Sequence, residues 1–453
     1  MRGALAMLWL VRATGFVAPI VRRHGRAMAR SAESVVEPSS SVRSPPIDLY
    51  TLRPRELEAL VVGEFGAPRY RAKQLSKWMY ERGAAGFDEM VDLPKGFRAQ
   101  LAARATLGGT LALAREEVSA RDGTVKRAYA LRDGQLIESV LMAYDDGRRT
   151  ACVSSQAGCA MGCTFCATGQ MGFARQLTEA EIFEQVQRYS AELRARGERL
   201  SGLVMMGMGE PLANWRAVSG ALARVVSELG VGARHITVST VGLAPRIRAL
   251  AAAAAAARAA ADGADAGADA GDVSLHGIGL AVSLHSVDDA ARSAVMPVNR
   301  RWPVAELLAA CKEYVDASGR RITFEWALIA GENDDAATAR ALAARLVGAG
   351  LKGKCHVNVI PLNPTKKFGG AASSRRAVDG FIAELEARGV PATIRVRRGI
   401  DIDAGCGQLK AKVLEKDERA AAAASRAAPL GDPTAARLVQ FEEAVQAYDV
   451  ARP

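Results

Sequence analysis

The central part of the chain alternates short apolar runs with longer amphipathic segments. The apolar runs are rich in β-branched residues: "TACVSS" from residue 150, then "LSGLVMMG", "HITVST", "IGLAVSLH", "RITFEWALI" and "CHVNVIPL". Segments between them, such as 178–196, 303–317 and 335–349, have the apolar spacing of surface helices. This alternation predicts parallel strands in an α/β fold, as a partial (βα)6 barrel or a flat, doubly wound sheet.

The polar residues that follow each run favour the barrel. Each predicted strand ends in a cluster of polar, glycine or proline residues, and parallel barrels keep their reactive groups at the carboxyl ends of the strands. That face would collect several cysteines together with Glu210, Ser239, Ser283, His285 and Asn363. The sequence therefore predicts one site at the carboxyl ends of the strands.

Two smaller segments precede the predicted barrel. The first, residues 48–105, has the pattern of a helix, a turn and a second helix, with basic residues beside aromatic ones. These residues are Arg69, Arg71, Lys73, Lys77, Tyr70, Trp78 and Tyr80. The pattern fits a solvated basic face over a small helical core and an RNA-docking module equally well. The second segment, residues 106–148, is all-β with a hairpin turn at Asp133-Gly134.

The other segments complete the predicted organisation. They are a leader and linker at 1–47, the barrel at 149–411 and a C-terminal tail at 412–453. Alanine-rich, low-complexity sequence at about 252–272 separates the third and fourth predicted strands. We expect this insert to form a helix extension and a disordered loop, without a chemical role.

Charge and the first residues bear on the partner and the compartment. The net charge of +11 and the pI of about 9.5 favour a polyanionic partner such as nucleic acid. Residues 1–32 contain six arginines and no acidic residue, which is typical of a targeting peptide for a plastid or mitochondrion. The alternative is an untargeted tail on a cytoplasmic protein. No later stretch resembles a membrane span, so we expect a soluble monomer without a membrane partner.

Four of the seven cysteines fall within residues 151–173, "ACVSSQAGCAMGCTFCATGQMGF". Three of these, Cys159, Cys163 and Cys166, have C-x3-C-x2-C spacing, and three kinds of site compete to explain them. A structural zinc would need Cys152 as its fourth ligand. A disulfide would leave three closely spaced thiols unexplained. A 4Fe–4S cluster on three thiolates would leave one iron open to a substrate or cofactor.

The cysteine motif, with Phe165 before its last cysteine, resembles that of the radical S-adenosylmethionine enzymes. The segments "MGMGEPLANWRAV", "HITVSTVGL", "LAVSLHS", "VNVIPLNP" and "VRRGIDIDAGCGQL" are similar, in the same order, to the RlmN-type dual-specificity RNA methyltransferases. The resemblance covers about residues 49–412 and includes "RYRAKQLSKWMY" in the basic N-terminal module. It implies a partial barrel, a 4Fe–4S cluster and S-adenosylmethionine as cofactors.

The resemblance also implies a reaction. A methyl group would be added to carbon 2 of adenine, in 23S-type ribosomal RNA near the peptidyl transferase centre and in tRNA beside the anticodon. Of two S-adenosylmethionine molecules per turnover, one would methylate Cys406 and the other would supply the radical that removes hydrogen from that methyl group. The methylene would then bond to RNA, Glu138 would remove the ring proton, and Cys152 would release the product by forming a disulfide with Cys406.

The remaining implied roles concern ligands and partners. Cys159, Cys163 and Cys166 would hold the cluster. Positions that match the family's S-adenosylmethionine contacts are Gly209, Glu210, Ser239, Ser283, Leu284, His285 and Asn363. The implied partners are ribosomal RNA, tRNA and a reducing protein of the flavodoxin or ferredoxin type.

Two other functions stay open on the sequence. One is a relative of the same family that methylates carbon 8 of the adenine, and it differs in the product nucleoside. The other is a non-enzymatic RNA-binding protein in which Cys152, Cys159, Cys163 and Cys166 hold a structural zinc. The metal content of the protein distinguishes the second.

Overall fold

The computed structural model describes residues 46–262, 277–365 and 367–410. The predicted C-terminal tail lies outside the described residues, and so does the predicted leader except for residues 46 and 47. Among the described helices, none is long and apolar enough to cross a membrane.

The N-terminal module consists of short helices tied together by a two-stranded sheet. Its helices are α1 (Pro54–Gly63), α2 (Tyr70–Ser76), η2 (Lys77–Glu81), η3 (Phe87–Glu89) and α3 (Lys95–Arg104). Strand β1 (Ile47–Asp48) pairs in parallel with β2 (Ala105–Thr106), so the two ends of the module meet. The aromatic residues do not share a surface, because Tyr80 is buried whereas Tyr70 is exposed.

The module is attached to the rest of the protein through a buried arginine. Arg224, on α6 (Trp215–Leu229), donates to the Tyr50 carbonyl oxygen at 2.7 Å and to the Tyr80 hydroxyl at 2.9 Å. Its guanidinium also lies 3.9 Å from the ring centre of Phe183, on α5 (Glu179–Ala195). The module therefore meets the helices α5 and α6 through polar contacts that water does not reach.

One ten-stranded sheet forms the centre of the molecule, in the order β14-β13-β12-β11-β10-β9-β6-β5-β4-β3. Its parallel strands are β6 (Arg149–Cys152), β9 (Gly202–Met205), β10 (Ile236–Thr240), β11 (Gly279–Ser283), β12 (Ile322–Leu328), β13 (Cys355–Pro361) and β14 (Ala392–Ile394). The predicted parallel strands are confirmed, and β14 adds a short one that the apolar runs did not indicate. The sheet stays open, with β14 and β3 at its edges.

The β segment before the barrel is part of the same sheet. Strands β3 (Leu111–Val118), β4 (Val125–Leu131) and β5 (Leu136–Ala143) are antiparallel, and β5 pairs with β6. The sequence predicted a separate β segment, because alternation along each strand does not show which strand it pairs with. Strand β6 therefore has an antiparallel neighbour on one side and a parallel one on the other.

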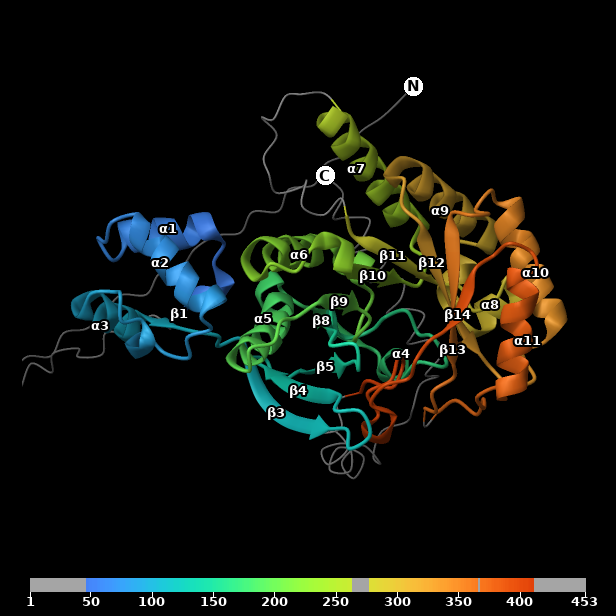
Figure 1. The fold of residues 1–453 in the computed structure, drawn as a ribbon, viewed down its shortest axis with the longest axis horizontal. Coiled ribbons are helices and arrows are strands. Elements are labelled where there is room, and N and C mark those ends of the chain that lie inside the picture. Colours follow the sequence, from blue (N-terminus) through green and yellow to red (C-terminus); the bar gives the residue numbers. More distant parts are fainter. Residues whose placement is uncertain (1–45, 263–276, 366, 411–453) are drawn as a thin grey trace, which may run out of the picture. The chain divides into compact units, whose positions relative to one another are not determined.

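Helices α7 (Ala244–Asp262), α8 (Asp289–Val295), α9 (Val304–Ser318), α10 (Ala336–Gly348) and α11 (Arg375–Glu386) follow the strands. Figure 1 shows α9, α10 and α11 along the outside of strands β12 to β14. Leu307, Leu308 and Cys311 of α9 are buried, as amphipathic spacing requires. Helix α7 runs into the alanine-rich insert as far as Asp262, as expected; the part of the insert from 263 to 272 lies outside the described residues.

A small hairpin holds the cysteine-rich loop. Strand β7 (Gln156–Gly158) pairs with β8 (Phe173–Gln176), and the three cysteines of the motif lie between them. At Gly158, where φ is 77°, a side-chain Cβ would lie 2.1 Å from the Gly172 carbonyl oxygen, so only glycine permits this crossing.

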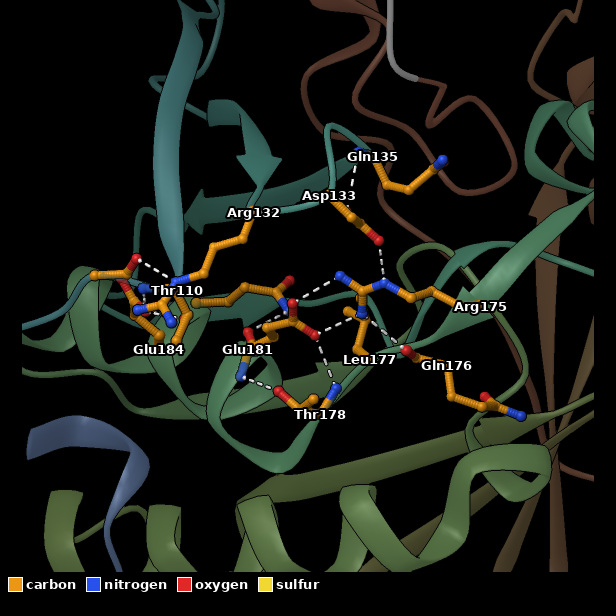
Figure 2. A network of polar contacts seen from close by, with 12 residues as sticks. Thr110, Arg132, Asp133, Gln135, Arg175, Gln176, Leu177, Thr178, Glu181 and Glu184 are labelled. Carbon is orange, nitrogen blue, oxygen red and sulfur yellow. Dashed lines mark hydrogen bonds and ion pairs between the residues drawn. The ribbon is translucent and has the colours of Figure 1, made fainter. Parts of the chain in front are cut away.

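A polar network fixes this hairpin to its surroundings (Figure 2). Arg175 of β8 donates to Asp133, in the turn between β4 and β5, and to both carboxylate oxygens of Glu181 at 2.8 and 2.9 Å. Glu181 also belongs to the capping box that begins α5, in which the Thr178 hydroxyl accepts from the Glu181 N–H at 3.2 Å. The network thereby holds β8, the turn between β4 and β5, and the start of α5 at fixed positions around the cysteine-rich loop.

Candidate active site

A cavity of about 160 Å³ opens at the carboxyl ends of the parallel strands. Residues from the cysteine loop and from the ends of β9, β10, β11 and β13 line it. The sequence-predicted residues on its wall are Cys159, Cys163, Cys166, Gly209, Glu210, Ser239, Ser283, His285, Asn363 and Cys406. The structure thus brings together residues that are up to about 250 positions apart in the chain.

Backbone hydrogen bonds hold the cysteine loop against three other segments. The Cys159 N–H donates to the Gly172 carbonyl oxygen at 2.7 Å, which closes the loop at its base. The Thr164 N–H donates to Val295 of α8 at 3.0 Å, and the Ala167 N–H donates to Gly407 at 2.7 Å. The three thiols therefore face the cavity from a loop that other parts of the barrel position.

Glu210 lies in the turn after β9 and is almost completely buried. Its two carboxylate oxygens accept from the backbone N–H groups of Leu212 at 3.0 Å and Val241 at 2.8 Å. Burial raises the pKa of this carboxyl to about 7. The preceding residue must be glycine, because a Cβ at Gly209 would lie 2.5 Å from the Gln156 Cβ.

His285 has an unusual backbone conformation for a residue with a side chain, with φ at 59°. Its Nδ1 accepts from the Ala327 N–H at 2.8 Å, which leaves the proton of the neutral ring on Nε2. Burial lowers the pKa of this imidazole to about 3, so the ring is neutral throughout the physiological range. Its ring meets that of Phe165 edge to face, with 4.8 Å between centres.

The two serines and the leucine among the matched positions behave differently. Ser239 and Ser283, at the ends of β10 and β11, line the cavity. Leu284 does not line it, because its side chain is fully buried in the core. The Leu284 backbone also has its own partners, the Glu325 carbonyl oxygen and the Arg292 guanidinium. A role for Leu284 in binding a cofactor therefore stays a prediction without geometric support.

Cys406 belongs to a loop that crosses the mouth of the cavity after β14. The Asn363 Nδ2 donates to the Cys406 carbonyl oxygen at 3.0 Å, and the Thr168 hydroxyl donates to Leu409 at 2.8 Å. Figure 1 shows this C-terminal segment passing beside α4 (Ala167–Met171), the helix that follows the cysteine motif. Cys406 thus lies over the same cavity as the three motif cysteines.

The fourth cysteine of the opening stretch lies elsewhere. Cys152, at the end of β6, lines a second, smaller cavity together with Cys406, and the three motif cysteines are not among the residues that line it. Cys406 and Asn363 line both cavities. The arrangement separates the thiols into a group of three and a pair, with Cys406 between them.

Arg395 lines the same two cavities and was not among the residues predicted from the sequence. Its guanidinium lies 3.3 Å from the Met206 sulfur and 3.4 Å from the Glu325 carboxylate. Asn358 holds that carboxylate from the other side at 2.9 Å. Cys406 raises the pKa of Arg395. Glu325 is the single acidic residue of the apolar run "RITFEWALI", and this isolated carboxylate was the sequence signal that a buried cation would lie nearby. The run does not show which arginine supplies that cation.

Glu138 lies on β5 and is not among the residues that line either cavity. The pairing of Val140 with Cys152 puts these two side chains on the same face of the sheet, and Glu138 lies two residues before Val140. Alternation along the strand therefore puts Glu138 on that same face. Its side chain is buried, and its strand pairs with β6, whose Cys152 lines the second cavity. Its predicted role as a base stays a prediction.

The arrangement of the thiols bears on which metal group the site can hold. Among the described residues, no three His, Cys, Asp or Glu side chains converge closely enough to bind a single metal ion. Cys152 does not line the cavity of the three motif cysteines, so the four thiols of the predicted zinc site do not share a cavity. A cluster binds each thiolate to a different iron, and the three motif cysteines line one cavity.

The cavity also has a place for a polar ligand. The Oδ1 atom of Asn363 is a buried acceptor without a hydrogen-bond partner among the residues that the structure describes. Glu210 offers a second, carboxylate acceptor on the same wall. Buried acceptors normally have partners, so the Asn363 Oδ1 fits a bound molecule that carries N–H or O–H donors. The Glu210 carboxylate already accepts from two backbone N–H groups and can accept from such a molecule as well.

Comparison with known proteins gives consistent matches along the chain. Residues 47–107 match the family of the ribosomal RNA large subunit methyltransferase N-terminal domain, and residues 153–342 match the radical SAM superfamily. The dual-specificity RNA methyltransferase RlmN 1 of Myxococcus xanthus is 45% identical over 374 residues, which cover 82% of this chain and 96% of that protein. The RlmN protein of Anaeromyxobacter dehalogenans is 44% identical over 385 residues, or 83% and 95%.

A solved structure agrees with these matches. The crystal structure of a radical SAM methyltransferase from Sphaerobacter thermophilus superposes with a TM-score of 0.70 at 45% sequence identity. The match covers 81% of this chain and 99% of that chain.

Proposed function

Since this chain belongs to the RlmN family of radical S-adenosylmethionine RNA methyltransferases, we propose that it methylates carbon 2 of adenine in ribosomal RNA and tRNA. The observation that best supports the proposal is the division of the thiols. The three motif cysteines line the main cavity, Cys152 lines the second one, and Cys406 lines both. This arrangement suits a reaction that needs three cysteines to hold a cluster and two further cysteines that react with each other.

The cluster and the bound S-adenosylmethionine would supply a carbon radical that removes one hydrogen atom from a methyl group on the Cys406 sulfur. Cys159, Cys163 and Cys166 would hold the cluster. Glu210 and the Asn363 Oδ1 would accept from the ammonium group of the cofactor, and the neutral His285 would offer its Nε2–H. The Cys406 loop, held by Asn363, would keep its sulfur over the cofactor.

Release from RNA would involve the other residues. After the methylene bonds to carbon 2, Glu138 would take the proton from that carbon, and one electron would return to the cluster. The Cys152 thiolate would then attack the Cys406 sulfur. An S–S bond forms, the carbon–sulfur bond breaks, and its electron pair stays on carbon and takes a proton to complete the methyl group. Two electrons from an external thiol or reducing protein would restore both cysteines.

Cofactor binding should depend on pH through Glu210, whose pKa burial raises to about 7. The carboxylate that would pair with the cofactor's ammonium exists above this pKa and is neutralised below it. We therefore expect the affinity for S-adenosylmethionine to fall as pH decreases, by up to about tenfold per pH unit below about 7. Calorimetric titration of the reconstituted protein measures this dependence. Glu210→Gln should bind weakly at every pH, Glu306→Gln should follow the parent, and a pH-independent parent would contradict the assignment.

Arg395 should speed the release step. Burial raises the pKa of Cys152 to about 12, with Cys406 contributing in the same direction, and Arg395 opposes this shift. Arg395→Met should therefore slow the decay of the protein–RNA bond, on the order of tenfold, while Arg395→Lys should retain most of the rate. A time course of denaturing gels with labelled RNA follows the decay. Arg388→Met, two residues after the end of α11, serves as the control for loss of an arginine. Decay at the parental rate in Arg395→Met would argue against this role.

The proposed RNA targets and the carbon-8 alternative are distinguished by product analysis. RNA from cells that lack this protein should lose 2-methyladenosine from the ribosomal RNA and from tRNA, and re-expression should restore it. Mass spectrometry with both methyladenosine standards identifies the product. Loss of 8-methyladenosine instead would support the carbon-8 reaction, and unchanged RNA would contradict both.

The compartment is a further proposal, which the arginine-rich, acid-free residues 1–32 support. A fluorescent protein fused after residue 47 should enter a plastid or mitochondrion, and cytoplasmic fluorescence would contradict the targeting role.

A further inference from the structure

A buried arginine lies behind the cysteine loop without a role in the reaction described above. Arg292, on α8, has a fully buried side chain. Burial lowers its pKa to about 10, so it keeps its charge at neutral pH, and the Cys163 thiol is the first of the groups that oppose this shift. A buried charge is costly unless another charge compensates it.

The hydrogen bonds of Arg292 all end on neutral acceptors. Among the residues that the structure describes, these are the carbonyl oxygens of Leu284, Ser283 and Val241 at 2.8 to 3.0 Å, and the Asn299 amide oxygen at 2.9 Å. These four bonds engage most of the five guanidinium N–H groups but do not neutralise the charge. Within the described part of the chain, the Asp289 carboxylate makes no hydrogen bond to the guanidinium. It accepts instead from the Asn299 amide nitrogen at 3.0 Å and from the Val304 N–H.

The same segment contacts the cysteine loop directly. Val295, three residues after Arg292, accepts from the Thr164 N–H at 3.0 Å, between Cys163 and Cys166. The next residue, Met296, lines the cavity with the motif cysteines. Arg292 and the loop therefore form one packed unit, in which the Cys163 thiol and the guanidinium are electrostatic neighbours.

We infer that Arg292 is the counter-charge of the iron–sulfur cluster and raises its reduction potential. Three thiolates outweigh the positive charge of the oxidised cluster core, so the occupied site is anionic, and one added electron makes it more so. A permanent positive charge in the adjacent core favours the reduced form, because little water screens the interaction. This inference rests on the cluster that the proposed function requires, but not on the identity of the RNA target.

A purely structural role is the competing explanation, since Arg292 also ties together the ends of β10 and β11. The two roles differ in what they need from the side chain. The structural role needs the hydrogen bonds, and the electrostatic role needs the charge. Arg292→Gln keeps amide donors and loses the charge, whereas Arg292→Lys keeps the charge and loses part of the hydrogen-bonding geometry.

Asn299→Asp tests the same charge without changing Arg292. It replaces the neutral acceptor at 2.9 Å by a carboxylate of nearly the same shape, which would face the guanidinium on one side and the Asp289 carboxylate on the other. The change therefore adds a negative charge beside Arg292. Arg300→Gln, on the exposed side of the same segment, is the matched control, because solvent screens its charge.

The experiment is a reductive titration of the full-length, anaerobically reconstituted proteins, monitored by electron paramagnetic resonance, after iron and sulfide analysis of each. At a fixed potential, the ratio of reduced to oxidised cluster should fall on the order of tenfold in Arg292→Gln, a shift of about 59 mV for one electron. Asn299→Asp should shift in the same direction. Arg292→Lys and Arg300→Gln should titrate like the parent.

Parental potential in fully loaded Arg292→Gln, or an equal shift in Arg292→Lys, would overturn the inference. If Arg292→Gln does not retain iron, the midpoint of Asn299→Asp decides the question alone. Failure of the parent protein to bind iron and sulfide would instead contradict the proposed function, so the two results are distinguishable.

Discussion

Cys152→Ala protein isolated from cells should be covalently bonded to RNA through Cys406. Without Cys152, the steps that form the carbon–sulfur bond to adenine can proceed, but no neighbouring thiol can break that bond. Nearly complete loss of turnover is the expected kinetic effect. A denaturing gel should show a slowly migrating band that ribonuclease converts to the mobility of the free protein.

The structure allows sharp controls for this result. Cys152 shares its cavity with Cys406 and not with the motif cysteines, so Cys152→Ala should retain iron and still cleave S-adenosylmethionine. Cys406→Ala and the double variant should give no shifted band. Iron-free Cys152→Ala protein, or a shifted band that persists without Cys406, would reverse the roles assigned to these cysteines.

Replacing any one cysteine of the motif should abolish cofactor cleavage. Cys159→Ala, Cys163→Ala and Cys166→Ala each leave two motif thiols to bind the cluster, which is too few to keep it in place. We expect iron content near zero and a decrease in 5′-deoxyadenosine formation of at least about a thousandfold, because the radical step is removed entirely. Metal analysis and chromatography of the cofactor products measure the two effects.

Two other cysteines provide a matched comparison. Cys311 and Cys355 are fully buried, and neither lines the cavities described above. Their replacement by alanine removes a thiol and creates only a small void, so it should lower stability modestly and leave the iron content unchanged. If a motif variant keeps its iron and forms 5′-deoxyadenosine at the parental rate, the cluster assignment is wrong.

Much of the fold could be predicted because the parallel strands are buried on both faces and stand out as apolar runs. The run from Cys355 became β13, and the run from Arg321 became β12. β14 escaped detection because it has three residues, Ala392–Ile394, whose pattern is no different from a loop. The continuity of β5 with β6 also escaped, because pairing between strands depends on register and not on composition.

The site was predictable to a different degree. Cysteine spacing and strand-end polar residues indicated most of the cavity wall, including Glu210 and His285. Leu284 was predicted to contact the cofactor because it lies between Ser283 and His285 in the chain, but its side chain is buried in the core. Arginine is common in this chain, so only the three-dimensional packing shows that Arg292 is buried and that Arg395 lines both cavities.

The separation of Cys152 and Cys406 along the sheet has a consequence for the protein's thermal behaviour. Cys152 ends β6 inside the sheet, and Cys406 follows β14 at its edge. A bond between them would close most of the barrel into one covalent ring and would restrict the unfolded chain. The oxidised enzyme should therefore melt at a higher temperature than the reduced enzyme. Each catalytic cycle would form and then reduce this disulfide, so the stability of the protein would rise and then fall. The melting temperature would therefore show whether a sample has accumulated in the disulfide form or in the dithiol form.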